Sequence, residues 1–186
     1  HLNVKDRGSN PFFEVDEFVV VSCSNIVPLK RVEIIFTLLA KLPFKVRWIH
    51  IGAGAGMNNL KELVLKNGSG NIEVELRGHL ENEQLIQFYQ TQKINLFIHL
   101  SETEGGVPLV LQEAASFGIP LLGADAGGVR EIVTAETGIL IPLHFREEEA
   151  IEQLKRMHSS AYNNTEFRKK VKAFWNAHFN ADKNKS

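Results

Sequence analysis

The sequence predicts an α/β protein built on a doubly wound parallel sheet of about six strands, with helices on both faces. Two observations carry this prediction. Short apolar runs rich in β-branched residues alternate with segments whose apolar residues recur at helical spacing. The runs are also apolar at consecutive positions, which is typical of strands buried on both faces of a parallel sheet.

The predicted elements follow one another from residue 18 onward. Strands are expected at residues 18–24, 46–51, 72–76, 94–100, 119–122 and 138–141. Helices are expected at residues 32–42, 57–66, 81–89, 108–117 and 147–157, with a further helix opening at Gly127. A strand followed by a helix, repeated along the chain, gives a Rossmann-like arrangement.

The two ends differ from this pattern. Residues 1–17 contain Gly8, Ser9, Asn10 and Pro11 and are interpreted as a linker or stub. Residues 161–186 are expected to form a C-terminal amphipathic helix and tail. The apolar face of this helix would need a partner surface, and it consists of Phe167, Val171, Phe174, Trp175 and Phe179. Because the chain begins without Met or a cleavage signal, it is expected to be a fragment of a longer one.

Composition limits the function classes. The chain has 186 residues and a mass of 20.9 kDa, the size of one domain. Its 21 Lys and Arg against 22 Asp and Glu give a net charge of −1, without a basic surplus for a nucleic-acid partner. No apolar run approaches the roughly 18–20 residues of a membrane span. The single cysteine, Cys23, cannot form an intramolecular disulfide, so a reducing, cytoplasmic location is expected.

The loops that follow the strands are the candidate sites, because ligands of open parallel sheets bind beyond the carboxyl ends of the strands. After the second predicted strand, Gly52, Gly54 and Gly56 approach the dinucleotide fingerprint G-x-G-x-x-G, but Met57 stands where its third glycine is required. The pattern favours a tight strand-to-helix turn with close backbone packing. A dinucleotide oxidoreductase is the less favoured alternative.

The loop SETEGGVP, residues 101–108, is the strongest candidate. Pro108 suits the first position of a helix, and the free amides there can bind phosphate or sugar oxygens. Gly105 and Gly106 let the backbone approach a ligand without a Cβ in the way. Glu104 stands at the mouth, and Glu113 lies one and a half turns into the helix, where a carboxylate can accept two hydrogen bonds from a diol. The alternative for either glutamate is an ordinary surface position.

Further candidates flank this loop. Gly127 and Gly128 are expected to add amides to the same rim, and Lys30 after the first strand could neutralise a diphosphate, with a solvated lysine as the alternative. The seven histidines include no pair at i, i+3 or i, i+4, so no metal site is predicted. His50 and His99 lie within strands and are expected to be satisfied there.

Taken in order, these pieces resemble the donor-binding C-terminal domain of retaining glycosyltransferases with the two-domain GT-B fold, the group 1 or glycogen-synthase-like sugar transferases. The resemblance covers about residues 18–179 and rests on PLKRV, IGAGAG, RGHL, the Glu-rich loop with EAASFGIP, and AGGVREIV with TGILIP. It implies that residues 18–160 bind a nucleotide-sugar and that residues 1–17 lead from a missing N-terminal acceptor domain.

The resemblance also implies residue roles. Glu104 lies beside the donor sugar, Glu113 holds the ribose hydroxyls, and Lys30 contacts the donor diphosphate; Glu104 and Lys30 are the expected catalytic residues. The other donor-binding residues line the cleft or follow the base, and they are Asn25, Gly105, Gly106, Val107, Gly52, Gly54, Arg77, Gly78, His79 and Leu80.

Two positions depart from the family pattern. Asn25 stands where the family usually has an arginine five residues before the lysine, and it can donate a hydrogen bond but carries no charge. Two outcomes are expected: either diphosphate binding is weaker, or Arg31 or another cation compensates. Glu104 and Glu113 are nine residues apart, whereas the family spacing is eight. A bulge at Gly105 and Gly106 could absorb the extra residue.

The implied reaction is transfer of a hexosyl group from a UDP- or GDP-sugar to an acceptor such as a glycan or lipid-linked saccharide, with retention at the anomeric carbon. Lys30 and the helix amides would stabilise charge on the departing diphosphate, so neither a metal nor another cofactor is expected. The expected partners are the nucleotide-sugar and the missing domain, and any membrane association would come through that domain. The alternatives are an epimerase-like enzyme of the same architecture and a non-catalytic nucleotide-binding module. The isolated fragment is expected to be inactive.

Overall fold

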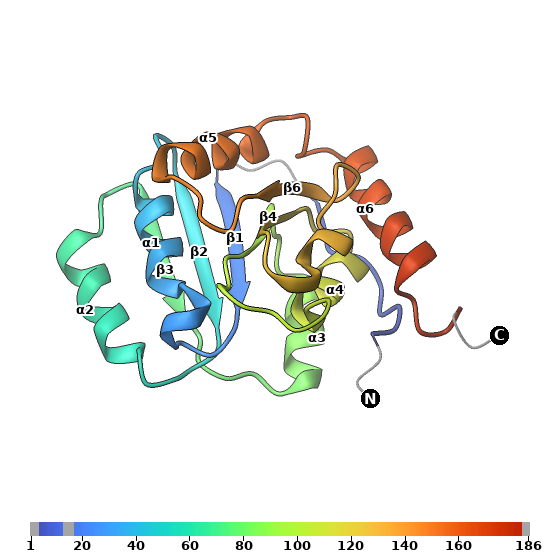
Figure 1. Ribbon diagram of the computed structural model, residues 1–186, viewed down its shortest axis with the longest axis horizontal. Helices are drawn as coiled ribbons and strands as arrows, with labels where there is room; N and C mark the ends of the chain where they lie inside the picture. Colours follow the sequence, from blue (N-terminus) through green and yellow to red (C-terminus); the bar gives the residue numbers. More distant parts are fainter. Residues whose placement is uncertain (1–3, 13–16, 184–186) are drawn as a thin grey trace.

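The computed structural model describes residues 4–12 and 17–183, in which one sheet lies between two layers of helices (Figure 1). The strands are β1 (Phe18–Cys23), β2 (Val46–Ile51), β3 (Ile72–Leu76), β4 (Leu96–His99), β5 (Leu121–Ala124) and β6 (Gly138–Ile141). The helices are α1 (Val32–Ala40), α2 (Met57–Asn67), α3 (Asn82–Thr91), α4 (Leu109–Ser116), α5 (Glu147–His158) and α6 (Thr165–His178), with 3-10 helices η1 (Pro28–Lys30) and η2 (Gly127–Glu131).

The six strands form a single sheet in the order β3-β2-β1-β4-β5-β6, and every pairing is parallel. The predicted fold class is therefore confirmed. In this order β2 and β3 lie on one side of β1, and β4, β5 and β6 lie on the other, so the topological switch point of the sheet lies between β1 and β4. Open parallel sheets bind ligands at such a point, beyond the carboxyl ends of the strands.

Both faces of the sheet are buried, as the continuous apolar runs predict. Phe18 and Val20 of β1 face a cluster that includes α1, α2 and α5, whereas Val19 and Val21 face a cluster that includes α3, α4 and α6. Burying each apolar side chain of this kind stabilises the folded state by about 1.5–3 kcal/mol relative to leaving it exposed. The sheet is thus a rigid platform for the loops at its edge.

Two elements differ from the prediction. The fifth strand, expected at residues 119–122, is β5 at Leu121–Ala124. Pro120 has no amide hydrogen, so the hydrogen bonds that join β5 to the chain before β6 begin with the amide of Leu121. The segment that opens at Gly127 is the short 3-10 helix η2, which begins with Gly127 in the left-handed region, at φ +51°.

The C-terminal helix α6 has a partner within this domain. Phe167, Val171 and Trp175 are buried in the same cluster as Ala114 and Ala115 of α4. The partner surface that the sequence predicts for this apolar face therefore lies within the domain for these three residues, where the small side chains of α4 let the two helices pack together. Phe174 and Phe179 are half-buried.

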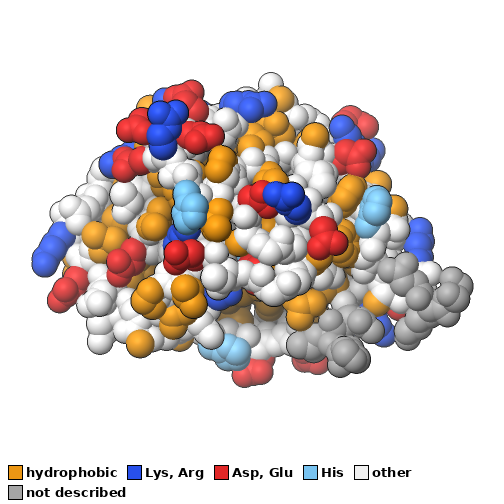
Figure 2. Space-filling view, in the orientation of Figure 1, with side chains coloured by type: hydrophobic (Ala, Val, Ile, Leu, Met, Phe, Trp, Pro, Cys, Tyr) orange, Lys and Arg blue, Asp and Glu red, His pale blue; other side chains and the backbone are white. Residues whose placement is uncertain are grey.

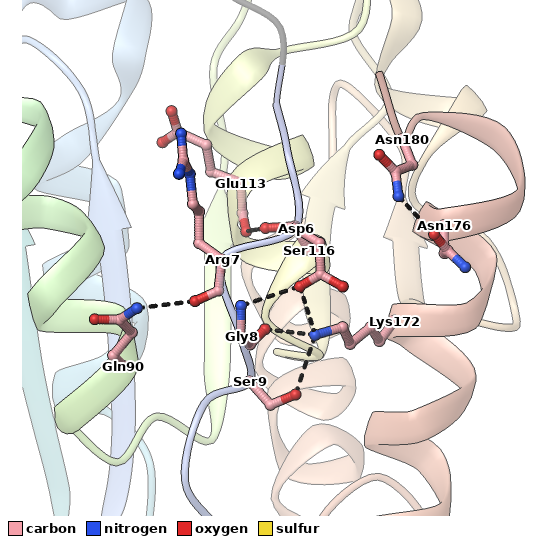
Figure 3. Close-up of polar contacts among 10 residues, drawn as sticks. All are labelled: Asp6, Arg7, Gly8, Ser9, Gln90, Glu113, Ser116, Lys172, Asn176 and Asn180. Carbon is pink, nitrogen blue, oxygen red and sulfur yellow. Dashed lines mark hydrogen bonds and ion pairs between the residues drawn. The ribbon is translucent and has the colours of Figure 1, made fainter. Parts of the chain in front are cut away.

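Residues 4–12 lie against the domain, beside α6 (Figure 3). Asn10 is buried and donates through Nδ2 to the carbonyls of Tyr89 and Gln92, each at 2.7 Å. Lys172 of α6 donates to Asp6 Oδ1 at 3.0 Å. The other parts of the predicted linker and tail, residues 1–3, 13–16 and 184–186, lie outside the described residues. The domain boundaries therefore stay a prediction.

The surface carries mixed charges on the face shown in Figure 2, where acidic and basic side chains gather together over α5. This mixture fits the net charge of −1. Within residues 4–12 and 17–183, none of the helices has both the length and the apolarity needed to cross a membrane.

Candidate functional site

The loops that follow β1 and β4 meet at the carboxyl edge of the sheet. Lys30 of η1 and Glu104 of the loop after β4 are 74 residues apart in sequence, and Lys30 Nζ lies 3.1 Å from Glu104 Oε1. The Nε2 atom of His99, the last residue of β4, lies 2.8 Å from the same oxygen. The fold therefore brings both predicted catalytic residues together and adds a histidine beside them.

Glu104 is held as an anion. The hydrogen bond from His99 and that from Lys30 lower the pKa of Glu104 to about 2, against the opposing effect of partial burial. The side chain of Glu104 is 15% exposed and that of His99 only 6%, so solvent screens the pair weakly. At neutral pH this edge presents a carboxylate whose oxygen Oε1 already has two donors.

Neighbouring loops hold the 101–107 loop in place. The amide of Glu102 donates to the carbonyl of Leu29 at 2.7 Å. A Cβ on Gly127 would lie 1.9 Å from the Glu104 carbonyl oxygen, and the amide of Gly128 donates to Gly106 at 3.2 Å. Gly127 and Gly128 therefore pack against the site loop, and the expectation that the Gly128 amide is free for a ligand is wrong.

Gly105 and Gly106 behave differently. Both are exposed, and a Cβ built on either would meet nothing within 4 Å. Their backbone is therefore accessible from outside, as the sequence predicts for a loop that faces a ligand. Val107, which follows them, is half-buried and packs against the apolar cluster that includes α3, α4 and α6.

The glycine turn after β2 packs on the loop after β1. A Cβ on Gly52 would lie 1.9 Å from the Ser24 carbonyl oxygen, and one on Gly54 would lie 2.7 Å from that of Ile26. Close backbone packing thus explains both glycines without a ligand. The Gly52 amide also donates to the carbonyl of Gly78 at 2.7 Å, which places the turn beside residues 77–80.

Residues 77–80, which are predicted to pass along the nucleotide base, are only partly free for a ligand. The guanidinium of Arg77 contacts Glu75 at 3.1 Å and lies over the ring of Phe88. His79 is exposed and contacts Glu81 at 3.3 Å. Leu80 packs against the apolar cluster that includes α3, α4 and α6.

The cation next to Lys30 does not compensate for the uncharged Asn25. Arg31 Nη1 donates to the carbonyl of Leu143 at 2.8 Å, and its guanidinium lies 5.5 Å from the centre of the Phe145 ring. Arg31 thereby fastens the loop before α5. The Asn25 side chain is exposed at the rim.

Glu113 lies in a different environment. It lines a cavity of about 90 Å³ whose walls are residues 4–7 together with α3 and α4, and these walls include Lys5, Arg7 and Tyr89. Burial raises the pKa of Glu113. The buried Tyr89 Oη has no hydrogen-bond partner among the described residues. Sequence reasoning missed the wall formed by residues 4–7, because a linker-like composition gives no signal that a segment docks.

Cys23 completes the surroundings of Glu113. Its pKa is raised to about 12 by burial and, to a smaller extent, by the charge of Glu113, so the thiol stays protonated at neutral pH. Across the described ranges no three His, Cys, Asp or Glu side chains cluster in a way that could hold a metal ion.

The fold and this edge define the chain as a Rossmann-like α/β domain. Residues 5–174 match the family described as glycosyl transferases group 1. The chain belongs to this family, and the predicted resemblance is confirmed.

Curated relatives agree with this assignment. The GtfA subunit of the UDP-N-acetylglucosamine--peptide N-acetylglucosaminyltransferase of Streptococcus parasanguinis is 35% identical over 92 residues, which is 48% of this chain and 17% of that protein. The sulfoquinovosyl transferase SQD2 of Arabidopsis thaliana is 29% identical over 120 residues, 64% of this chain and 22% of that protein. The chain spans about a fifth of the length of these relatives.

Solved structures share the fold. The lipopolysaccharide outer core galactosyltransferase WaaB, in its apo form, superposes with a TM-score of 0.81 at 20% identity, over 96% of this chain and 50% of that one. HepE of Anabaena in complex with UDP-glucose superposes with a TM-score of 0.74 at 20% identity, over 90% of this chain and 46% of that one.

Proposed function

We propose that this chain binds a nucleotide-diphosphate sugar at the carboxyl edge of its sheet and forms the donor half of a retaining hexosyltransferase. One observation carries the proposal. Lys30 and Glu104 are brought together from the loops after β1 and β4, 3.1 Å apart, beside the exposed residues Gly105 and Gly106. A cation, a carboxylate and accessible amides at one place suit a ligand that carries both phosphate and hydroxyl groups.

Lys30 is proposed to contact the diphosphate. Its ammonium has three donors, of which one is used by Glu104, so two are left for phosphate oxygens. As the bond to the sugar breaks, negative charge grows on the departing diphosphate, and a positioned ammonium stabilises it electrostatically. The protein itself would supply this charge, so the proposed mechanism needs no metal.

Glu113 is proposed to bind the ribose. Its half-buried carboxylate loses part of its solvation, and two neighbouring hydroxyl groups of a ribose are donors that would restore its hydrogen bonds. The cavity beside Glu113 is small, so it suits part of a nucleoside rather than a whole donor. The base would then follow residues 77–80, beside the glycine turn at Gly52.

The family and its relatives support a transfer reaction. Two relatives are named as transferases, and one solved neighbour holds UDP-glucose. The 186 residues cover about half of the solved neighbours, so we propose that they bind the donor without transferring it. Domain closure positions reactants and excludes water, and half of a cleft does neither.

Calorimetry with UDP-glucose and GDP-mannose, each beside its free nucleoside diphosphate, tests donor binding. We expect one of these pairs to bind. Lys30→Met should weaken binding of the nucleoside diphosphate more than binding of the matching monophosphate. The matched control is Lys169→Met, which removes a lysine from an exposed ion pair on α6. Absence of binding by both nucleotide families, or equal losses for mono- and diphosphate, would contradict the proposal.

The proposed inactivity of the isolated chain has its own assay. Release of labelled sugar to water or to a glycan acceptor is measured with the 186 residues and with the full-length protein. We expect turnover from the full-length protein only. Equal turnover by the shorter chain would show that its site is complete by itself.

A further inference from the structure

We infer that His99 is a positioning residue of the donor site, which fixes Glu104 so that the free carboxylate oxygen and Lys30 face the donor. This inference rests on the proposed function, because it concerns how the same site is held. His99 belongs neither to the glycine loops nor to the predicted donor-binding residues.

The contact has a defined direction. A carboxylate at neutral pH only accepts hydrogen bonds, so His99 Nε2 carries the proton in its 2.8 Å contact with Glu104 Oε1. His99 is rigid because it is the last residue of β4 and pairs with Gly123 of β5. A side chain fixed to the sheet therefore anchors a carboxylate that stands on a loop.

The other strand histidine shows what a purely internal role looks like. His50 Nε2 contacts the Ser24 carbonyl at 3.0 Å and its Nδ1 contacts Ser22 Oγ at 2.7 Å, while Trp48 donates to the same hydroxyl. Burial lowers the pKa of His50 to about 4, so it stays neutral. His50 is satisfied by Ser22 of the neighbouring strand β1 and by Ser24, which follows that strand, whereas His99 points its donor at a predicted ligand-binding group.

The anchor has two consequences for the site. His99 and Lys30 both donate to Oε1, so Oε2 has no donor among the described residues and is left for a sugar hydroxyl. Lys30 gives one of its three donors to Glu104 and keeps two for a diphosphate whether or not His99 is present. Loss of His99 should therefore act on the contact with the sugar and leave the contact with the diphosphate largely unchanged.

The test uses two substitutions at His99. His99→Leu keeps apolar volume in a site that is almost fully buried but removes the donor, and His99→Gln keeps an N–H group near the position of Nε2. We expect His99→Leu to weaken whichever of UDP-glucose and GDP-mannose binds by about tenfold, with a change below about threefold for the free diphosphate. His99→Gln should restore affinity to within about threefold. The control is His158→Gln, at a histidine that stacks on Phe44, and it should leave the affinity for the nucleotide-sugar unchanged.

The double variant His99→Leu with Glu104→Gln gives a second readout. Since His99 acts through Glu104, the double variant should bind the nucleotide-sugar no more weakly than Glu104→Gln alone. Additive losses, a failure of Gln to rescue, or equal losses for sugar donor and free diphosphate would each overturn the inference.

A ligand-free measurement separates this inference from the proposed function. Carboxyl titration by ¹³C NMR should show the pKa of Glu104 rising from about 2 toward its ordinary range in His99→Leu and staying low in His99→Gln. An unchanged titration in His99→Leu overturns the positioning role whether or not nucleotides bind. Conversely, a shifted titration in a chain that binds no nucleotide-sugar would contradict the proposed function alone.

Discussion

Glu104 and Glu113 are nine residues apart in one stretch of chain, yet the fold gives their carboxylates opposite surroundings. Glu104 accepts hydrogen bonds from Lys30 and His99, which lower its pKa to about 2. Glu113 is desolvated against a small cavity, which raises its pKa. One carboxylate is therefore satisfied by the protein, and the other is left for a ligand to satisfy.

The two regions also depend on different parts of the molecule. The Glu104 region is held by the loops that follow β1, β4 and β5, including the contact of Gly127 with the Glu104 carbonyl. The Glu113 region is closed by residues 4–7, which are fastened through Asn10 and Lys172. Because the supports differ, each region can be perturbed while the other is monitored.

The largest expected effect comes from Gly127→Ala, which disturbs the Glu104 region. Gly127 has φ +51°, and an added Cβ would lie 1.9 Å from a backbone oxygen, so the loop must move. We expect a loss of about 3 kcal/mol of folding free energy, from left-handed strain and overpacking together. For a domain of this size, that lowers the melting temperature by roughly 6–12 °C.

Gly105→Ala is the matched control for Gly127→Ala. It adds the same methyl group to the same cluster of loops, but at a position with nothing within 4 Å. The melting temperature should change little, within the equivalent of about 0.5 kcal/mol, while affinity for a nucleotide-sugar falls. Equal destabilisation by both alanines would show that the two kinds of glycine do not differ as proposed.

The second prediction separates the glutamates by ligand. Glu113→Ala should weaken binding of the free nucleoside diphosphate by about 2 kcal/mol, roughly thirtyfold, because charge-assisted hydrogen bonds to the ribose are lost. Glu104→Ala should act on the intact donor and leave the free diphosphate nearly unchanged. Calorimetry with both ligands and both variants gives the four values. If Glu104→Ala lowers the affinity for the intact donor and for the free diphosphate equally, Glu104 contacts the nucleotide rather than the sugar.

This contrast shows how far sequence reasoning reaches. The alternation of strands and helices along the chain and the burial of both sheet faces follow from the local apolar pattern, so the fold class was predictable. The family motif indicated that Lys30 and Glu104 lie at one edge. Close backbone packing at Gly52 and Gly54 is predicted from the glycine turn and is confirmed. The packing of Gly127 against the Glu104 carbonyl depends on a neighbouring loop, and no local sequence pattern reports it. The docking of residues 4–12 depends on buried hydrogen bonds of Asn10 to carbonyls about 80 residues away, which leave no periodic signal.

The third prediction disturbs the Glu113 region through Asn10→Ala. This change leaves the buried carbonyls of Tyr89 and Gln92 without donors and frees the segment that walls the cavity. We expect a loss of about 1.5 kcal/mol in folding free energy and faster amide exchange in residues 4–12. Asn176→Ala, which removes a side-chain contact of α6 with Asn180, is the control. Unchanged exchange would mean that the segment is held by other contacts.

The smallest effect should appear in the pH dependence of stability, with opposite signs for the two glutamates. A lowered pKa in the folded state stabilises the fold above the ordinary glutamate range, and this contribution is lost as the pH falls from about 4.5 toward 2. A raised pKa does the reverse, because the ionised carboxylate costs stability once the pH rises above about 4.5. Glu104→Gln should therefore lower the melting temperature at pH 7 by roughly 2–4 °C, the equivalent of about 1 kcal/mol. Glu113→Gln should raise it by a smaller amount, and both differences should shrink at pH 4. Shifts of the same sign in thermal melts at pH 7 would mean that the two carboxylates share one environment, and the contrast between the regions would fail.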